Sequence, residues 1–206
     1  MNIIKIYILE ILFLSSVLLL QAIKLPKGVV WKKNIYKILL ICWIVFIGSV
    51  SISLLIHIPL FRAISENNIE AVSQLLDKHP DWINADKFWG DTPLHTAVQV
   101  ANLDIIKLLI NRGADVNEVK DFGVTPLHIA VYNNNIEIAK LLLNSGADIN
   151  SIGYRQDYTP LHIAICGHNM EMIKFLIQNN ADLSIKDGKG RTSIEHALEN
   201  KIVLPK

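Results

Sequence analysis

The tetrapeptide Thr-Pro-Leu-His occurs three times in this chain at a nearly constant spacing. It spans Thr92–His95, Thr125–His128 and Thr159–His162, and a degenerate copy follows at the same spacing, at Thr192–Glu195. A period of about 33 residues is typical of a solenoid of short helical units. Such units bury their apolar faces against one another and offer extended binding surfaces.

Each copy of the motif opens a unit with the same local signals. Thr is an N-cap residue and Pro fits the first helical turn, so a helix is predicted to begin at each motif. A polar break and a second helix follow, such as Asp104–Ile110, in which apolar residues recur three and four apart. Gly113 and Gly146 then stand where a left-handed residue ends a helix. The sequence therefore predicts an all-α solenoid.

These residues resemble ankyrin repeats over positions 59–206. The resemblance rests on three copies in register, each with Thr-Pro-Leu-His, a Leu-rich second helix and a closing Ala-Asp. It implies two antiparallel helices and a projecting β-hairpin loop in each unit. It also implies that His95, His128 and His162 bond backbone groups and tie neighbouring repeats together.

The expected repeat domain has atypical ends, as solenoids usually do. We expect a degenerate first repeat at 59–89, full repeats at 90–122, 123–156 and 157–189, and a partial last repeat at 190–206. The third loop is one residue longer than the others. In the sequence, Thr159 lies one position further from Asn150 than Thr125 lies from Asn117.

Two long apolar stretches precede the repeats, at residues 6–23 and 38–58. Each reaches the roughly 20 residues that cross a bilayer. They predict a transmembrane helical hairpin over residues 1–58, with helices at about 4–23 and 36–58. A cleavable signal peptide is the alternative for the first stretch. It is disfavoured because Glu10 interrupts the stretch and no small-residue cleavage site follows.

The loop at 24–37 decides the predicted orientation. It contains five of the six Lys of residues 1–58, and basic loops stay on the cytoplasmic side. The loop is therefore expected in the cytoplasm and the ankyrin domain outside it. The predicted localisation is that of an integral protein of a bacterial inner membrane.

Charge and motif content exclude several function classes. Residues 59–206 carry 14 Lys or Arg against 18 Asp or Glu, a net charge of −4, which disfavours nucleic acid as a partner. The three motif His would lie on packed helices about 8–10 Å apart, too far for one metal ion with bonds of about 2 Å. Because the sequence has no nucleophile–base motif and no phosphate-binding loop, we expect no enzyme, no cofactor, no metal and no small-molecule substrate.

Surface residues that differ between repeats are the predicted protein-binding site. In ankyrin proteins the loop tips and the exposed part of the first helix usually carry binding, and aromatic and Arg side chains dominate hot spots. By position these residues are Phe88, Trp89, Asp91, Asp121, Phe122, Tyr132, Tyr154, Arg155, Tyr158 and Arg191. Packing between neighbouring loop tips is the alternative, and Phe122 is the residue that fits it best.

The predicted function is a membrane-anchored, non-catalytic protein–protein interaction module with an unidentified protein partner. The alternative is an accessory or oligomeric subunit of a membrane transport or channel assembly, in which the hairpin is the working part.

Overall fold

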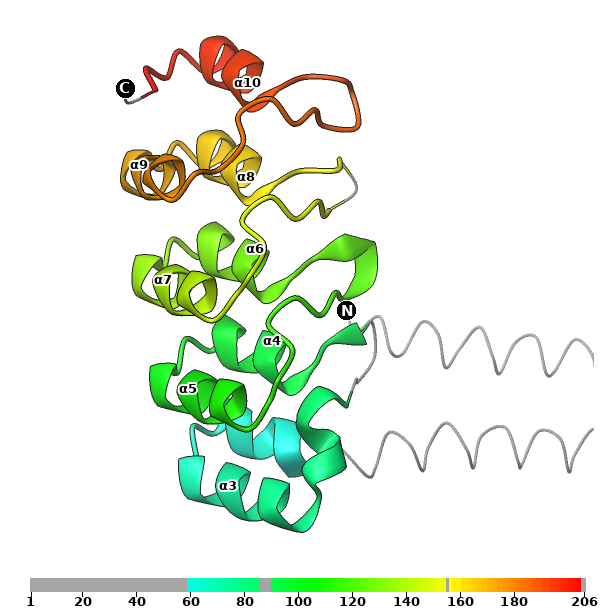
Figure 1. Cartoon of the computed structure of the whole chain (residues 1–206). Coiled ribbons are helices and arrows are strands. Elements are labelled where there is room, and N and C mark those ends of the chain that lie inside the picture. Colours follow the sequence, from blue (N-terminus) through cyan, green and yellow to red (C-terminus); the bar gives the residue numbers. More distant parts are fainter. Residues whose placement is uncertain (1–58, 86–89, 155, 205–206) are drawn as a thin grey trace, which may run out of the picture. The chain divides into compact units, whose positions relative to one another are not determined.

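The computed structural model describes residues 59–85, 90–154 and 156–204, which form a stack of short helices (Figure 1). Residues 59–65 are helical and lead into the second helix of the first unit, α3 (Ile69–Lys78), and a 3-10 helix, η1 (Pro80–Asn84). The following helices are α4 (Pro93–Gln99), α5 (Leu103–Asn111), the 3-10 helix η3 (Asp121–Gly123), α6 (Pro126–Tyr132), α7 (Ile136–Asn144), α8 (Pro160–Cys166), α9 (Met170–Gln178) and α10 (Ser193–Glu199).

The helices form two columns. Each first helix contacts its own second helix, so that α4 packs on α5, α6 on α7 and α8 on α9. The first helices also contact one another in the order α4, α6, α8 and α10, which makes them the inner column of the stack (Figure 1). A continuous apolar core runs between the columns. Leu94, Leu127 and Leu161, one from each motif, are fully buried in it.

The repeated motif begins each first helix with a reciprocal cap. In the second motif, Thr125 Oγ1 accepts the backbone N–H of His128 at 3.4 Å, and His128 Nδ1 accepts the backbone N–H of Thr125 at 3.1 Å. The same capping box forms at Thr92 and Thr159. Because Nδ1 accepts a hydrogen bond from a backbone N–H, Nδ1 itself carries no proton. Each imidazole is therefore neutral and has its proton on Nε2.

That proton joins one unit to the next. His95 Nε2 donates to the carbonyl oxygen of Val124 at 3.0 Å, and His128 Nε2 donates to that of Tyr158 at 3.1 Å. The prediction that the motif His rings tie repeats together is confirmed at these two positions. All three rings are fully buried.

The third imidazole departs from this pattern. The equivalent acceptor for His162 is the carbonyl of Arg191, but this carbonyl accepts the backbone N–H of Asp187 at 2.8 Å. Among the described residues, His162 Nε2 has no partner in hydrogen-bond geometry. The last joint of the stack is therefore built differently from the two before it.

The second helices are capped by Asn, a signal that the sequence analysis did not use. Asn102 Oδ1 accepts the backbone N–H of Ile105 at 3.0 Å, and an Asn precedes α3, α7 and α9 with the same bond. A second series of Asn residues links the units along the stack. Asn117 Oδ1, for example, accepts the backbone N–H of Asp148 at 2.8 Å.

The loops that project from the stack are hairpin-like but contain little β-structure. Within the described residues, isolated antiparallel bridges join Lys120 to Val124, Gly153 to Tyr158 and Lys186 to Thr192. The extra residue of the third loop lies between Gly153 and Tyr158, where Tyr154 and Asp157 both adopt positive φ. The implied β-hairpins are thus reduced to single bridges.

The predicted hairpin at residues 1–58 lies outside the described residues. The described α-helices contain between seven and ten residues each, about half or less of the length needed to cross a bilayer. None of the helices in ranges 59–85, 90–154 and 156–204 is long and apolar enough to span a membrane. The predicted localisation, an integral membrane protein with a cytoplasmic loop and an extracytoplasmic repeat domain, is therefore wrong as judged from these residues.

Acidification is expected to destabilise the stack through its buried motif imidazoles. Burial lowers the pKa of His128 from 6.5 to about 4 and also lowers the pKa of His95 and of His162. The unfolded chain binds these protons between pH 6.5 and 4 and the folded chain does not. Stability is thus fully present above about pH 6.5 and is lost as the pH falls toward 4.

For His128 alone, the free energy of unfolding is expected to fall by about 2 kcal/mol between pH 7.5 and pH 5. Urea denaturation across this pH range measures it. The His128→Asn variant should be less stable at pH 7.5 and should show a shallower dependence on pH. An unchanged pH dependence in this variant would mean that His128 does not titrate on unfolding.

Gly153→Ala is expected to destabilise the fold by about 2 kcal/mol, because the backbones of two neighbouring loops approach closely there. A Cβ on Gly153 would lie 2.5 Å from the carbonyl oxygen of Gly123 and 3.1 Å from Cε1 of His128. Gly146→Ala is the matched control: its φ of +92° costs about 1 kcal/mol, and its Cβ would meet nothing within 4 Å among the described residues. Urea denaturation measures the free energy of unfolding of both variants. Equal losses would contradict the close approach of the two loop backbones at Gly153.

Candidate functional site

Three of the ten predicted binding residues lie outside the described residues. These are Phe88 and Trp89 in the loop before α4, and Arg155 in the third loop. Their assignment to the binding site stays a prediction.

The acidic loop residues take part in local contacts. Asp91 Oδ1 lies 2.9 Å from Nζ of Lys120, and both side chains are partly buried. This ion pair joins the loops of two successive units. Asp121 starts η3 at the tip of the next loop, where it is partly exposed.

Phe122 follows at the same tip with a φ of +64°, and 56 % of it is exposed. The left-handed conformation is rare for a bulky residue, and here it places an aromatic ring at the surface. The interpretation of Phe122 as a purely structural residue therefore receives little support from its exposure.

Tyr132, Tyr154 and Tyr158 come together, although the first ends α6 and the other two lie in the loop before α8. They line one side of a groove of about 600 Å³ between α6 and α8. Val131, Cys166 and Met170 contribute to the rest of its wall, and none of the described residues that line it is Lys, Arg, Asp or Glu. Tyr132 is 72 % exposed, the most exposed of the three.

The rings of Tyr154 and Tyr158 pack on the buried imidazoles of the motifs. Tyr154 meets His128 edge-on at 5.8 Å between ring centroids, and Tyr158 stacks on His162 at 5.6 Å. Burial raises the pKa of both phenols, so both stay neutral donors at physiological pH. The wall of the groove is thus held by two buried motif imidazoles, of which His128 also joins two repeats.

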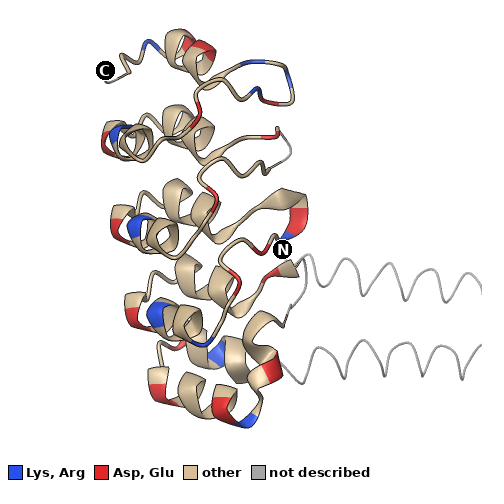
Figure 2. Ribbon diagram, viewed as in Figure 1, with Lys and Arg blue, Asp and Glu red and all other residues tan. Residues whose placement is uncertain are grey.

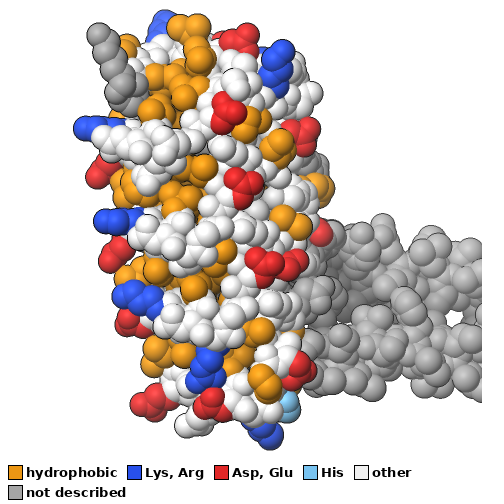
Figure 3. All heavy atoms as spheres, in the orientation of Figure 1, with side chains coloured by type: hydrophobic (Ala, Val, Ile, Leu, Met, Phe, Trp, Pro, Cys, Tyr) orange, Lys and Arg blue, Asp and Glu red, His pale blue; other side chains and the backbone are white. Residues whose placement is uncertain are grey.

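Charged side chains lie elsewhere on the stack. Acidic and basic residues occur together on the outer helices α5, α7 and α9 (Figure 2), for example Asp104 with Lys107 and Glu137 with Lys140. Figure 3 shows hydrophobic side chains at each level of the stack, bordered by these charges.

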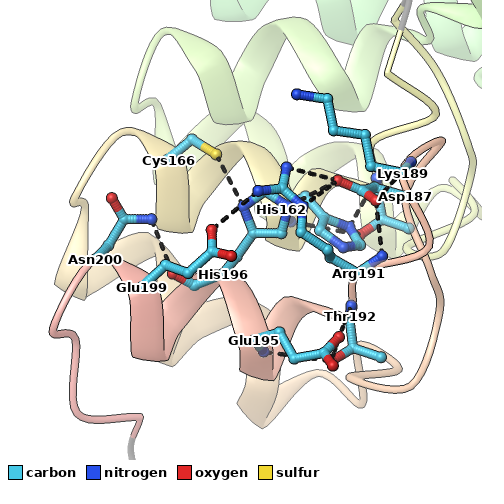
Figure 4. Close-up of polar contacts among 11 residues, drawn as sticks. His162, Cys166, Asp187, Lys189, Arg191, Thr192, Glu195, His196, Glu199 and Asn200 are labelled. Carbon is cyan, nitrogen blue, oxygen red and sulfur yellow. Dashed lines mark hydrogen bonds and ion pairs between the residues drawn. The ribbon is translucent and has the colours of Figure 1, made fainter.

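Arg191, the last predicted binding residue, belongs to a polar network under α8 (Figure 4). Its guanidinium donates to Asp187 Oδ2 from Nε at 3.2 Å and from Nη2 at 2.9 Å, and Nη1 donates to Glu199 at 2.9 Å. Asp187 Oδ1 also accepts the backbone N–H groups of Lys189 and Arg191, each at 2.8 Å. The Arg191 side chain is therefore held by the protein itself.

The Asp187 side chain is fully buried. Burial on its own raises the pKa of a carboxyl, but the donors from Arg191, His196 and Lys189 outweigh it and hold the pKa of Asp187 well below its usual range. The carboxylate is thus ionised inside the fold, and its charge is balanced by Arg191.

The network extends to a thiol that the sequence analysis did not connect with it. His196 Nε2 lies 2.9 Å from Asp187 Oδ2, and His196 Nδ1 lies 3.7 Å from Sγ of Cys166 (Figure 4). His196 is buried, whereas Cys166 is exposed on the groove. Local motifs could not reveal this contact, because the thiol and the imidazole belong to different helices, α8 and α10.

Family models for ankyrin repeats match residues 60–153 and residues 134–177. Residues 60–177 belong to the ankyrin-repeat family. The helix pairs of the stack, the motif caps and the joints between units are those of ankyrin repeats. The family is generally non-catalytic and implies protein partners.

Three curated relatives resemble short stretches of the repeats. A 2-5A-dependent ribonuclease of Mus musculus is 43% identical over 56 residues, which is 27% of this chain and 8% of the relative. The putative ankyrin repeat protein FPV230 of Fowlpox virus is 43% identical over 63 residues, 30% of this chain and 32% of the relative. Alpha-latrocrustotoxin-Lt1a of Latrodectus tredecimguttatus is 37% identical over 59 residues, 29% of this chain and 4% of the relative. The matches therefore span at most a third of these relatives, and the likeness is one of repeats.

Asp187→Ala is expected to destabilise the last ankyrin repeat by about 3 kcal/mol, because it leaves Arg191 and His196 without their acceptor in the interior. Asp182→Ala is the control. Asp182 is exposed and, among the described residues, its carboxylate accepts from Ser184, so its loss should have little effect on the free energy of unfolding. Urea denaturation compares the two, and a similar small cost for both would contradict the structural role of Asp187.

Proposed function

We propose that this chain is a non-catalytic protein-binding module whose main contact surface is the groove between α6 and α8 together with the neighbouring loop tips. The observation that carries the proposal is the grouping of Tyr132, Tyr154 and Tyr158 on a groove of about 600 Å³ whose described lining residues include no Lys, Arg, Asp or Glu.

The shape and chemistry of this groove suit an apolar or aromatic side chain of a protein partner. Binding hot spots combine a desolvated pocket with Tyr, Trp or Arg anchors. Two of the tyrosines are fixed by packing on His128 and His162, so ordering them on binding costs little conformational entropy. The exposed Tyr132 is free of such a stacking contact in the described residues and offers its ring to a partner.

The loop tips extend the same surface. Phe122 lies 56 % exposed at one tip, and we include Phe88, Trp89, Asp91, Asp121 and Arg155 in the surface by position. Arg191 serves the polar network first, since three of its nitrogens already donate to Asp187 and Glu199. We therefore leave Arg191 out of the contact surface.

Tyr132→Ala is expected to weaken partner binding by about 2 kcal/mol, roughly thirtyfold in Kd, without loss of stability. The probe is an affinity capture of interacting proteins with the full chain, quantified by mass spectrometry, followed by titration of any protein so identified. Leu198→Ala is the matched control, because Leu198 is 71 % exposed and lies on α10, away from the groove.

A partner that is lost with Tyr132→Ala and retained with Leu198→Ala supports the groove as the binding surface. A partner retained by both variants, with unchanged Kd, places the contact elsewhere on the repeats.

A further inference from the structure

The exposed thiol of Cys166 is in contact with a base that is itself held by a carboxylate. Cys166 ends α8, and His196 lies on α10 directly beneath it, as Figure 4 shows. The two distances, 3.7 Å from Sγ to Nδ1 and 2.9 Å from Nε2 to Asp187 Oδ2, form a continuous chain of hydrogen bonds. A nucleophile, a base and a group that orients the base are the parts that activate a weak nucleophile.

The direction of the hydrogen bonds follows from the carboxylate. Asp187 is ionised and only accepts, so Nε2 of His196 must carry a proton. In the neutral ring Nδ1 is then the acceptor, and its lone pair faces the thiol. The Cys166 S–H therefore donates to a nitrogen that can take the proton when sulfur attacks an electrophile.

Several charged and titratable groups surround Cys166 and His196. Asp187, Arg191 and Glu199 are charged. The rings of Tyr158 and His162 contact the ring of His196. Burial raises the pKa of the Cys166 thiol and outweighs the hydrogen bond of Tyr158 and the charge of Arg191, which lower it. At rest the sulfur is thus a protonated thiol, and the base removes the proton during the reaction.

We propose that Cys166 is a site of covalent modification that reacts with small neutral hydroperoxides, with His196 as its base and Asp187 as the residue that positions the base. The sulfur opens onto the groove, and the described residues of its wall, which carry no Lys, Arg, Asp or Glu, admit a neutral oxidant. This inference does not depend on protein binding by the groove.

The reaction balances without a further reactant. The sulfur of Cys166 attacks the nearer oxygen of the hydroperoxide, an S–O bond forms and the O–O bond breaks. The thiol proton passes to Nδ1 of His196 and from there to the departing oxygen. Cys166 is oxidised to a sulfenic acid, and the hydroperoxide is reduced to water or an alcohol.

The test uses the full chain with Cys42→Ser, so that Cys166 is the one thiol. Hydrogen peroxide is the oxidant, and dimedone trapping followed by intact-mass measurement gives the rate of sulfenic acid formation. At pH 7 the folded chain should react at least about tenfold faster than the urea-denatured chain, since base assistance commonly contributes more than this.

His196→Asn removes the base, and it should lower the folded rate at least about tenfold. Leu198→Ala is the control, because Leu198 is exposed on α10, the helix that carries His196, and is not among the residues that line the groove; it should leave the rate unchanged. Circular dichroism checks the fold of both variants.

A folded wild-type rate no greater than the denatured rate overturns the proposal, and so does an unchanged rate in folded His196→Asn. If His196→Asn does not fold, the comparison of folded and denatured wild-type chains decides the question alone.

Discussion

The buried neutral imidazole of the repeated motif is the interaction on which the stack depends. One nitrogen accepts the backbone N–H that begins its own helix, and the other donates to a carbonyl of the next unit. A single residue such as His128 thus closes a helix end and fixes the neighbouring repeat. Since a repeat cannot bury its apolar face alone, the local cap and the joint between units stabilise the fold together, which explains why Thr-Pro-Leu-His recurs unaltered while the surface residues differ.

Much of the stack could be predicted because its signals are local and periodic. The helices that begin at Pro93, Pro126 and Pro160 follow from Thr caps and first-turn Pro, and the positive φ of Gly113 and Gly146 follows from their place after a helix. The Asn caps of the second helices carried a signal of equal quality that went unused. The predicted localisation was based on residues 1–58 alone, which lie outside the described residues. It is wrong as judged from the described residues, because none of their helices is long and apolar enough to cross a membrane.

The candidate site was less predictable, because it is made by contacts between repeats. Position in the repeat selected Tyr132, Tyr154 and Tyr158 for protein binding, which stays a prediction, and these three line the groove. It also selected Asp91 and Arg191, whose side chains are engaged in ion pairs. The link from Cys166 to His196 was hidden for another reason. In the last motif Glu195 takes the capping position of the usual His, so the imidazole stands at the next position along and meets the preceding repeat.

The two kinds of joint give the stack an uneven response to acid. The internal joints rely on imidazoles that must remain neutral, whereas the C-terminal joint relies on a carboxylate that keeps its charge far below neutral pH. Moderate acidity therefore weakens the joints made by His95 and His128. At the last joint it acts on the buried His162 but leaves the ion pair of Asp187 with Arg191 in place, so the effect of acid differs from one joint of the stack to the next.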